Sequence, residues 1–174
     1  MSTEPLLNGR ADDAQFAQNP LPVVHAMGLA LGALHVSAPV ADLSPLTPAE
    51  VDAALAALDA LGPEETPPHP FGRVRVTTLE ETLRAAPKDR PLVPTHGAPI
   101  VSAAVLVDSV VTYEPAGCEG LDPAERDLAI VIRSLSETFT SEVSRTFLDG
   151  YLEAGGELPH GPTLDWYAVV AAFR

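Results

Sequence analysis

The sequence predicts a mainly α-helical fold of the α+β class with one small β-hairpin. Three observations support this prediction. Roughly six segments space their apolar residues with helical periodicity, and several begin at N-cap residues and end at glycine or proline. Two short β-rich runs, AAVLVD and VVTYE, lie next to each other. The 174 residues contain no internal repeat and suit one hydrophobic core, so we expect a single domain over 1–174.

The first half of the chain is predicted to hold a polar, irregular stretch over 1–20 and then helices at 23–35, 44–62 and 77–87. The second helix has the most complete boundary signals. Thr47 serves as N-cap, Pro48 takes the first helical position, and Glu50 completes a capping box. Gly62 would end this helix. The Pro-rich PEETPPHPFG that follows is interpreted as a surface connection within one domain.

The second half is predicted to begin with the hairpin over 103–114, with its turn at Asp108 and Ser109. Helices are expected at 121–135, 141–156 and 163–174. Asp122 caps the first of these, and Pro123 follows it. The apolar residues of each helix fall on one face, so we expect the three helices to share a core with the earlier ones.

The composition excludes several classes of function. With 24 acidic and 10 basic residues, the net charge is −14, which disfavours binding to nucleic acids and to anionic membrane surfaces. The charge either attracts cationic small molecules or only keeps the protein soluble, and solubility is preferred. No apolar run could span a bilayer, and the start of the chain lacks signal-peptide features, so a cytoplasmic location is expected. Cys118 is the single cysteine, and His25, His69 and His160 follow no ligand spacing. We predict no metal site.

The order of several motifs resembles the C-terminal lobe of the aminoglycoside phosphotransferase family, which shares its fold with protein kinases. AMGLALGALH is similar to the family's helix ending in Leu-His, and VPTHGAPIVSAAVLVD to its catalytic loop and following strand. The family's metal-binding segment resembles VVTYEPAGCEGLDPAERDLA. Its closing helices resemble FLDGYLEAGG and LDWYAVVAAF, and the hinge between its lobes resembles STEPLLNGR. The resemblance implies a kinase-like helical lobe. It also implies that the N-terminal nucleotide-binding lobe is absent, because no Gly-rich loop occurs and Lys88 is the single lysine.

The departures from the family pattern affect its chemistry. Ala98 stands where the family has the Asp that orients the attacking hydroxyl. The metal-binding Asn falls at Ala103 or Ala104, and the metal-binding Asp falls at Thr112. Phosphoryl transfer relies on positioning and on neutralisation of charge by metal ions, which methyl groups do not provide. The resemblance therefore implies a degenerate relative that does not transfer phosphate and needs no cofactor.

Two polar residues remain candidates for catalysis. Glu114 matches the family's Glu after the metal-binding Asp and is either an acid/base or cation-binding group or a solvated loop residue. His96 either acts in catalysis or braces the loop through hydrogen bonds to backbone, and the brace is preferred. We expect structural roles for His35 and for Asp127. The predicted ligand-binding cleft comprises Ala98, Ser102, Ala104, Thr112, Tyr113, Cys118 and Tyr167, although Tyr167 also suits the core.

Three functions remain open at this point. The first is use of the old cleft for a small organic molecule, with cationic compounds included. Such a protein would either bind the compound or catalyse a metal-free cyclisation or isomerisation, in a natural-product or antibiotic pathway. The second is a regulatory pseudokinase that binds a protein partner, or forms a homodimer, over a lobe interface near residues 1–24 and the hairpin. The third, and least favoured, is an active phosphotransferase.

Overall fold

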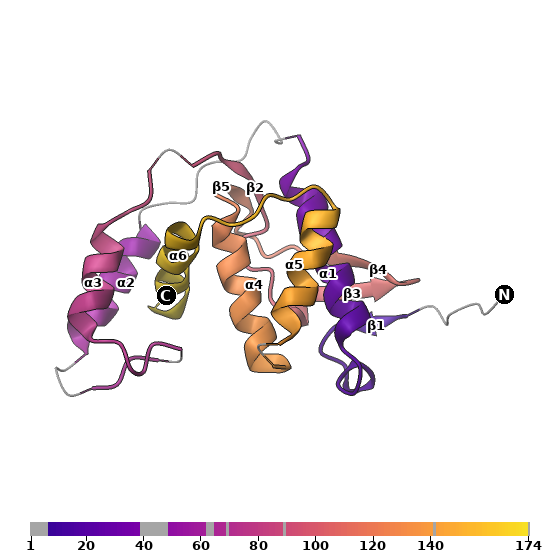
Figure 1. The fold of residues 1–174 in the computed structure, drawn as a ribbon, viewed down its shortest axis with the longest axis horizontal. Coiled ribbons are helices and arrows are strands. Elements are labelled where there is room, and N and C mark those ends of the chain that lie inside the picture. The colour runs from indigo at the N-terminus through magenta and orange to yellow at the C-terminus, as the bar shows by residue number, and fades with distance from the viewer. Residues whose placement is uncertain are drawn as a thin grey trace.

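Six helices and two small sheets make up the part of the chain that the computed structural model describes, which is residues 7–38, 49–61, 65–68, 70–88, 90–140 and 142–173 (Figure 1). The helices are α1 (Leu21–His35), α2 (Ala49–Ala60), α3 (Val76–Arg84), α4 (Glu125–Thr138), α5 (Val143–Glu153) and α6 (Gly161–Phe173). The strands are β1 (Gly9–Arg10), β2 (Val93–Thr95), β3 (Ala104–Val107), β4 (Val110–Tyr113) and β5 (Gly120–Asp122), with 3₁₀ turns at Ala14–Phe16 and Val101–Ala103. The predicted mainly helical fold with one hairpin is confirmed.

The first hydrophobic core joins α1, α4, α5 and the inner face of the hairpin. Met27 and Leu31 of α1 and Phe147 of α5 are among its completely buried members. The two helices approach closely because Gly28 faces α5, and a Cβ there would overlap the carbonyl oxygen of Phe147. Close packing of α1 against α5 fixes the helix that forms one wall of the candidate site described below.

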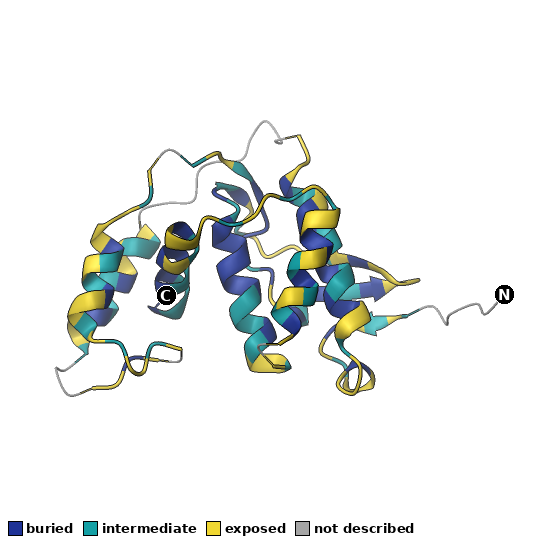
Figure 2. Cartoon of the chain, in the orientation of Figure 1, coloured by how far each residue is buried: buried dark blue, intermediate teal, exposed yellow. Residues whose placement is uncertain are grey.

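The second hydrophobic core joins α2, α3 and α6, and Ala129 connects it to α4. Trp166 of α6 is buried, and its indole N–H donates to the backbone oxygen of Leu83 at the end of α3 (3.0 Å). Figure 1 shows α2 and α3 side by side at the edge of the molecule, with α6 between them and α4. In Figure 2 the buried surfaces of these helices face one another, and the exposed residues lie on the outside.

The sequence predicted one of the three strand pairs in the two sheets. The β3–β4 hairpin is confirmed, and its turn residues Asp108 and Ser109 both have positive φ (50° and 66°), as a tight two-residue hairpin requires. The pairing of β1 with β3 and of β2 with β5 was not predicted. Strands of two or three residues carry too little periodicity to be recognised, and long-range pairing creates them.

The helix boundaries agree with the predicted ones to within a few residues. The predicted N-cap at Asp122 is wrong, because Asp122 ends β5, where it pairs with Val93, and α4 begins at Glu125. The cap residues Thr47 and Pro48 and the terminating Gly62 of the second helix lie outside the described residues, as does His69. None of the helices among the described residues is long and apolar enough to cross a membrane.

Candidate functional site

The loop over residues 95–104 is held in place by a buried carboxylate. Asp127, in the first turn of α4, is completely buried and accepts hydrogen bonds from the backbone N–H groups of His96 (2.6 Å) and Gly97 (2.9 Å). A carboxylate is also stabilised near a helix N-terminus, where backbone N–H groups are free. Asp127 therefore links α4 to the loop, in the structural role expected for it.

The same carboxylate continues into a buried network behind the loop. His35 Nε2 lies 3.3 Å from Asp127 Oδ2, and His35 Nδ1 lies 2.9 Å from the Tyr151 hydroxyl. Because a carboxylate only accepts, Nε2 carries the ring proton and Nδ1 accepts from Tyr151. Burial raises the pKa of Tyr151, which keeps its hydroxyl protonated as a donor. His35 is thus a structural residue, as expected.

Both ring nitrogens of His96 bind backbone groups. Its Nδ1 accepts from the N–H of Ala98 (3.3 Å), so Nε2 carries the proton and donates to the backbone oxygen of Glu114 (2.7 Å). The ring braces the loop against the end of β4, in agreement with the preferred interpretation. With both nitrogens engaged, the imidazole has no free position from which to move a proton to or from a ligand.

The outer side of the loop presents methyl groups and one exposed ion pair. Ala98, which the family resemblance places at the catalytic Asp, is partly exposed. Arg10 of β1 donates through Nη2 to the backbone oxygen of Ser102 and to Glu114 Oε2 (2.9 Å). The hydrogen bond and charge of Glu114 raise the pKa of Arg10. The Glu114 side chain is 54% exposed, so its carboxylate faces solvent and is neutralised by Arg10.

Three of the predicted cleft residues occupy other environments. Ala104 is completely buried in the first core and lines no surface. Cys118 is partly buried and packs against Gly97, whose φ of +87° and close contact with the Cys118 backbone leave no room for a side chain. Tyr167 is buried on α6, and its hydroxyl donates to the carboxylate of Asp122.

Tyr167 belongs to a separate polar cluster between α2, α4 and α6. Arg126, also buried, binds Glu50 of α2 (2.9 Å) and lies 3.8 Å from Asp122. Burial raises the pKa of Asp122 to about 6, although the hydrogen bond from Tyr167 and the charge of Arg126 oppose the shift. The structure therefore does not bring Tyr167 together with His96, and the cluster serves to join helices.

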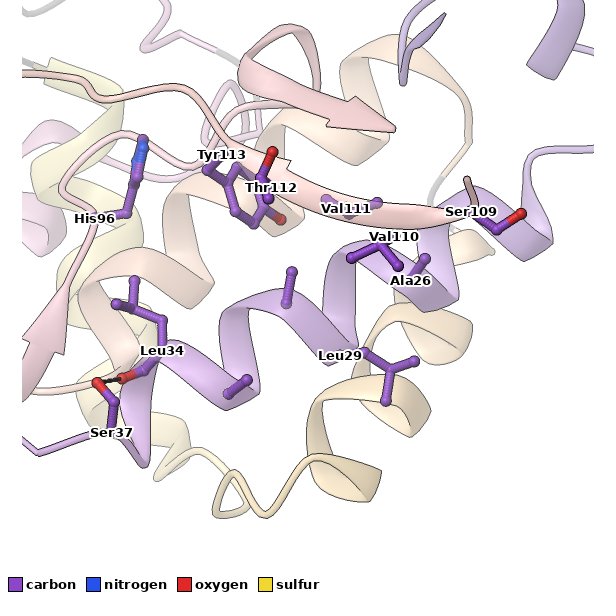
Figure 3. Close-up of a pocket in the computed structure, with 12 residues that line it drawn as sticks. Ala26, Leu29, Leu34, Ser37, His96, Ser109, Val110, Val111, Thr112 and Tyr113 are labelled. Carbon is purple, nitrogen blue, oxygen red and sulfur yellow. Dashed lines mark hydrogen bonds between the residues drawn. The ribbon is translucent and has the colours of Figure 1, made fainter. Parts of the chain in front are cut away.

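A groove between α1 and β4 forms a cavity with a volume of about 670 Å³ (Figure 3). Three of the predicted site residues, His96, Thr112 and Tyr113, line it. The remaining lining residues are Ala26, Leu29, Ala30, Ala33, Leu34, Ser37, Ser109, Val110 and Val111. We call this cavity the α1–β4 groove. It has no Asp, Glu, Lys or Arg in its lining, so it suits a largely apolar ligand.

Sequence reasoning missed the α1 wall of this groove, although one signal was present. Ala26, Ala30 and Ala33 recur at helical spacing, beside the leucine and methionine face that was assigned to the core. Short side chains on a partly exposed helix face leave space beside it. That space becomes a groove only because β4 lies alongside, which the sequence does not specify.

The residues on the outer side of the loop do not fit a magnesium nucleotide. Ala98, Ala103 and Thr112 hold no charged oxygen for the metal, and Glu114 is already paired with Arg10. Among the residues that the structure describes, no three His, Cys, Asp or Glu side chains gather as a metal site would require. We therefore derive no reaction step through a metal or nucleotide.

Comparison with known proteins shows the fold. No family model matches the sequence, and no curated protein is similar to it. Among solved structures, an aminoglycoside-3'-phosphotransferase of type VIII has a TM-score of 0.71 at 22% identity, over 99% of this chain and 67% of that one. An aminoglycoside phosphotransferase from Streptomyces rimosus has a TM-score of 0.68 at 16% identity, over 97% and 67%.

A choline/ethanolamine kinase family protein from Mesorhizobium loti aligns less closely, with a TM-score of 0.59 at 19% identity, over 90% of this chain and 51% of that one. The predicted resemblance in fold to aminoglycoside phosphotransferases and kinase-like proteins is confirmed over nearly the whole chain. The chain spans about two thirds of the phosphotransferases and half of the kinase relative. Identities this low show the fold and leave the activity open.

Proposed function

We propose that this chain binds a small organic molecule in the α1–β4 groove and does not transfer phosphate. The observation that supports the proposal most is the groove itself. At about 670 Å³, it falls within the range of small-molecule sites, and its lining is mostly apolar with a few polar groups. Those groups are the His96 ring and the hydroxyls of Ser37, Ser109, Thr112 and Tyr113.

The loss of phosphoryl transfer follows from the outer side of the 95–104 loop. A phosphotransferase must position the attacking hydroxyl and neutralise charge with metal ions. Ala98 offers no carboxylate for the hydroxyl. Thr112 offers a neutral oxygen in place of a charged ligand. The Glu114 carboxylate faces solvent beside Arg10.

Binding is a better account than chemical conversion for the same groove. The two candidate catalytic residues are both engaged. The His96 nitrogens bind backbone groups, and the Glu114 carboxylate binds Arg10. A metal-free cyclisation or isomerisation would need an acid or base in the groove. The Glu114 carboxylate does not line the groove, and the His96 imidazole has no free nitrogen. Natural-product intermediates form the first set to screen in the cytoplasmic setting expected from the sequence, because the high Ala, Pro and Gly content is typical of GC-rich genomes, in which antibiotic pathways are common.

Titration with the neutral apolar dye Nile red tests the groove. Saturable fluorescence enhancement is expected for the wild type. Ala33, an exposed residue of α1 that lines the groove, is changed to Phe to fill it, and Ala56→Phe on the exposed side of α2 is the matched control. We expect Ala33→Phe to weaken dye binding by at least about tenfold, while Ala56→Phe leaves it unchanged. Equal binding by both variants would contradict the proposal.

A second candidate function is supported by the outer face of the hairpin. Val107 and Val110 are 60% and 65% exposed and lie opposite each other in the β3–β4 pairing. Exposed apolar side chains at a predicted lobe interface suit a homodimer or a protein partner. Light scattering on a sizing column over a dilution series tests self-association. A concentration-dependent mass that Val107→Lys abolishes would support this function, since Val107 does not line the groove, and a monomer at every concentration would exclude the homodimer.

A further inference from the structure

We infer that the ligand of the α1–β4 groove is a short extended peptide, or a peptide-like compound, that pairs with the free edge of β4. This inference rests on the proposed function and names the chemical class of its ligand. Three features of the described residues carry it: the unpaired backbone groups of β4, the short side chains of α1 beneath that edge, and the distribution of charge.

The hydrogen-bond pattern of the hairpin shows which backbone groups are free. In an antiparallel pair, alternate residues bond to the partner strand, and the residues between them point the other way. Glu114 donates to the Ala103 oxygen, so residues 110 and 112 of β4 also face β3. Val111 and Tyr113 therefore direct their N–H and C=O groups to the opposite side, where β4 is the edge of the sheet.

No hydrogen bond within the described residues uses the backbone groups of Val111 or Tyr113. Proteins normally protect such edges with charged residues, proline or a covering segment. β4 reads Val-Val-Thr-Tyr, which has no charged residue and no proline and consists of residues with high strand propensity. Among the described strands, none pairs with its outer edge. Its edge can thus accept another strand through four hydrogen bonds, two from each free residue.

The position of α1 decides which side chains the added strand would carry. The Val111 side chain belongs to the first core, and the Tyr113 hydroxyl donates to the Met27 oxygen of α1 (3.3 Å), so both side chains face α1. In an added antiparallel strand, the residues directly opposite Val111 and Tyr113 would also direct their side chains toward α1. Their side chains would enter the groove above Ala26, Ala30 and Ala33, where short methyl groups leave room for small apolar side chains.

Charge favours a basic peptide over an acidic one. The groove lining has no charged side chain, so the paired portion of the ligand is neutral and apolar on its inner face. The chain as a whole has a net charge of −14, which attracts basic residues outside the paired portion. The expected ligand therefore has alternating small apolar residues over about four or five positions, flanked by basic groups.

A direct test uses the acetylated and amidated peptide Lys-Val-Thr-Val-Thr-Val-Lys and two N-methylated forms. In the inferred register each valine directs its side chain toward α1 and its N–H group toward β4. The threonine N–H groups face solvent. We expect isothermal titration to show that N-methylation of two valines weakens binding by at least about tenfold. N-methylation of the two threonines should change it by less than about threefold.

The controls separate failure of this inference from failure of the proposed function. Ala33→Phe should weaken both the peptide and Nile red, and Ala56→Phe neither. If Nile red binds in the groove but the peptide does not bind, or if both methylated peptides bind equally, the edge pairing is wrong and the proposed function stands. If neither probe binds, both fail. A dimer in light scattering that excess peptide leaves intact would show that a second copy covers the edge, which also overturns the inference.

Discussion

The inner and outer sides of the 95–104 loop use polar groups in opposite ways. On the inner side, Asp127, His35, Tyr151 and the ring of His96 are hydrogen-bonded, and the first three form one buried chain of contacts. On the outer side, Ala98 has no polar group, and the Glu114 carboxylate is exposed and bound to Arg10. The contrast teaches that the buried hydrogen bonds that hold this loop in place do not depend on charged side chains on its outer side.

Removal of the inner carboxylate should have the largest effect. Asp127→Ala leaves two buried N–H groups and His35 without their acceptor. We expect the free energy of unfolding to fall by about 3–5 kcal/mol in urea denaturation. Asp149→Ala, an exposed position on α5, is the control and should change little. A loss below about 1 kcal/mol for Asp127→Ala would show that the inner network does not hold the loop.

Backbone substitution within the loop should have the next largest effect. Gly97→Ala introduces a Cβ at a φ of +87°, where it would overlap the backbone oxygen of Cys118. Gly117→Ala is the matched control, since its φ is +72° and nothing lies within 4 Å of the added atom. We expect a loss of about 2–4 kcal/mol for Gly97→Ala and about 1 kcal/mol for Gly117→Ala, measured by urea denaturation. Equal losses would mean that the contact with Cys118 gives way freely.

Titration of Asp122 extends the comparison to the separate polar cluster between α2, α4 and α6. Burial raises its pKa from 3.8 to about 6. Between these values the folded chain keeps a proton that the unfolded chain has released, so the stability contributed by this group falls as pH rises. From about pH 4 to about pH 7, we expect wild type to lose about 1–2 kcal/mol relative to Asp122→Asn. Parallel pH profiles from urea denaturation would show that Asp122 titrates normally.

The outer ion pair should have the smallest effect. Arg10 and Glu114 are both exposed, and such pairs contribute little because solvent screens them. Glu114→Gln should leave the melting temperature and Nile red binding unchanged within error, since Glu114 does not line the groove. Loss of a ligand-dependent activity on this substitution would instead restore Glu114 as a catalytic residue.

The sequence predicted the parts of the fold that local pattern controls. Helical spacing located α1 and α4, and the β-rich runs around Asp108 and Ser109 located the hairpin. It did not predict β1, because Gly9 and Arg10 become a strand only by pairing with β3. That the loop has lost its catalytic side chains stays a prediction from the family resemblance. The hydrogen bonds of Asp127 and His96 agree with the structural roles expected for them.

The candidate site was less predictable because its contacts are long-range. Arg10 reaches Glu114 across more than a hundred residues, and no local pattern indicates such a pair. Ala104 ends the 95–104 loop and begins β3, and the pleat of β3 turns its side chain into the core. The groove depends on the placement of α1 beside an unpaired strand edge, which only the tertiary structure determines.

The central claim is that this chain keeps the phosphotransferase scaffold while using it without phosphoryl transfer. The most direct test is mass spectrometry of streptomycin after incubation with the chain, Mg²⁺ and ATP, beside a protein-free control. We expect no phosphorylated product and no ATP loss beyond the control, because the family resemblance places Ala98 and Thr112 where phosphotransferases orient the hydroxyl and bind the metal. A phosphorylated product that increases with protein concentration and disappears with EDTA would contradict the claim.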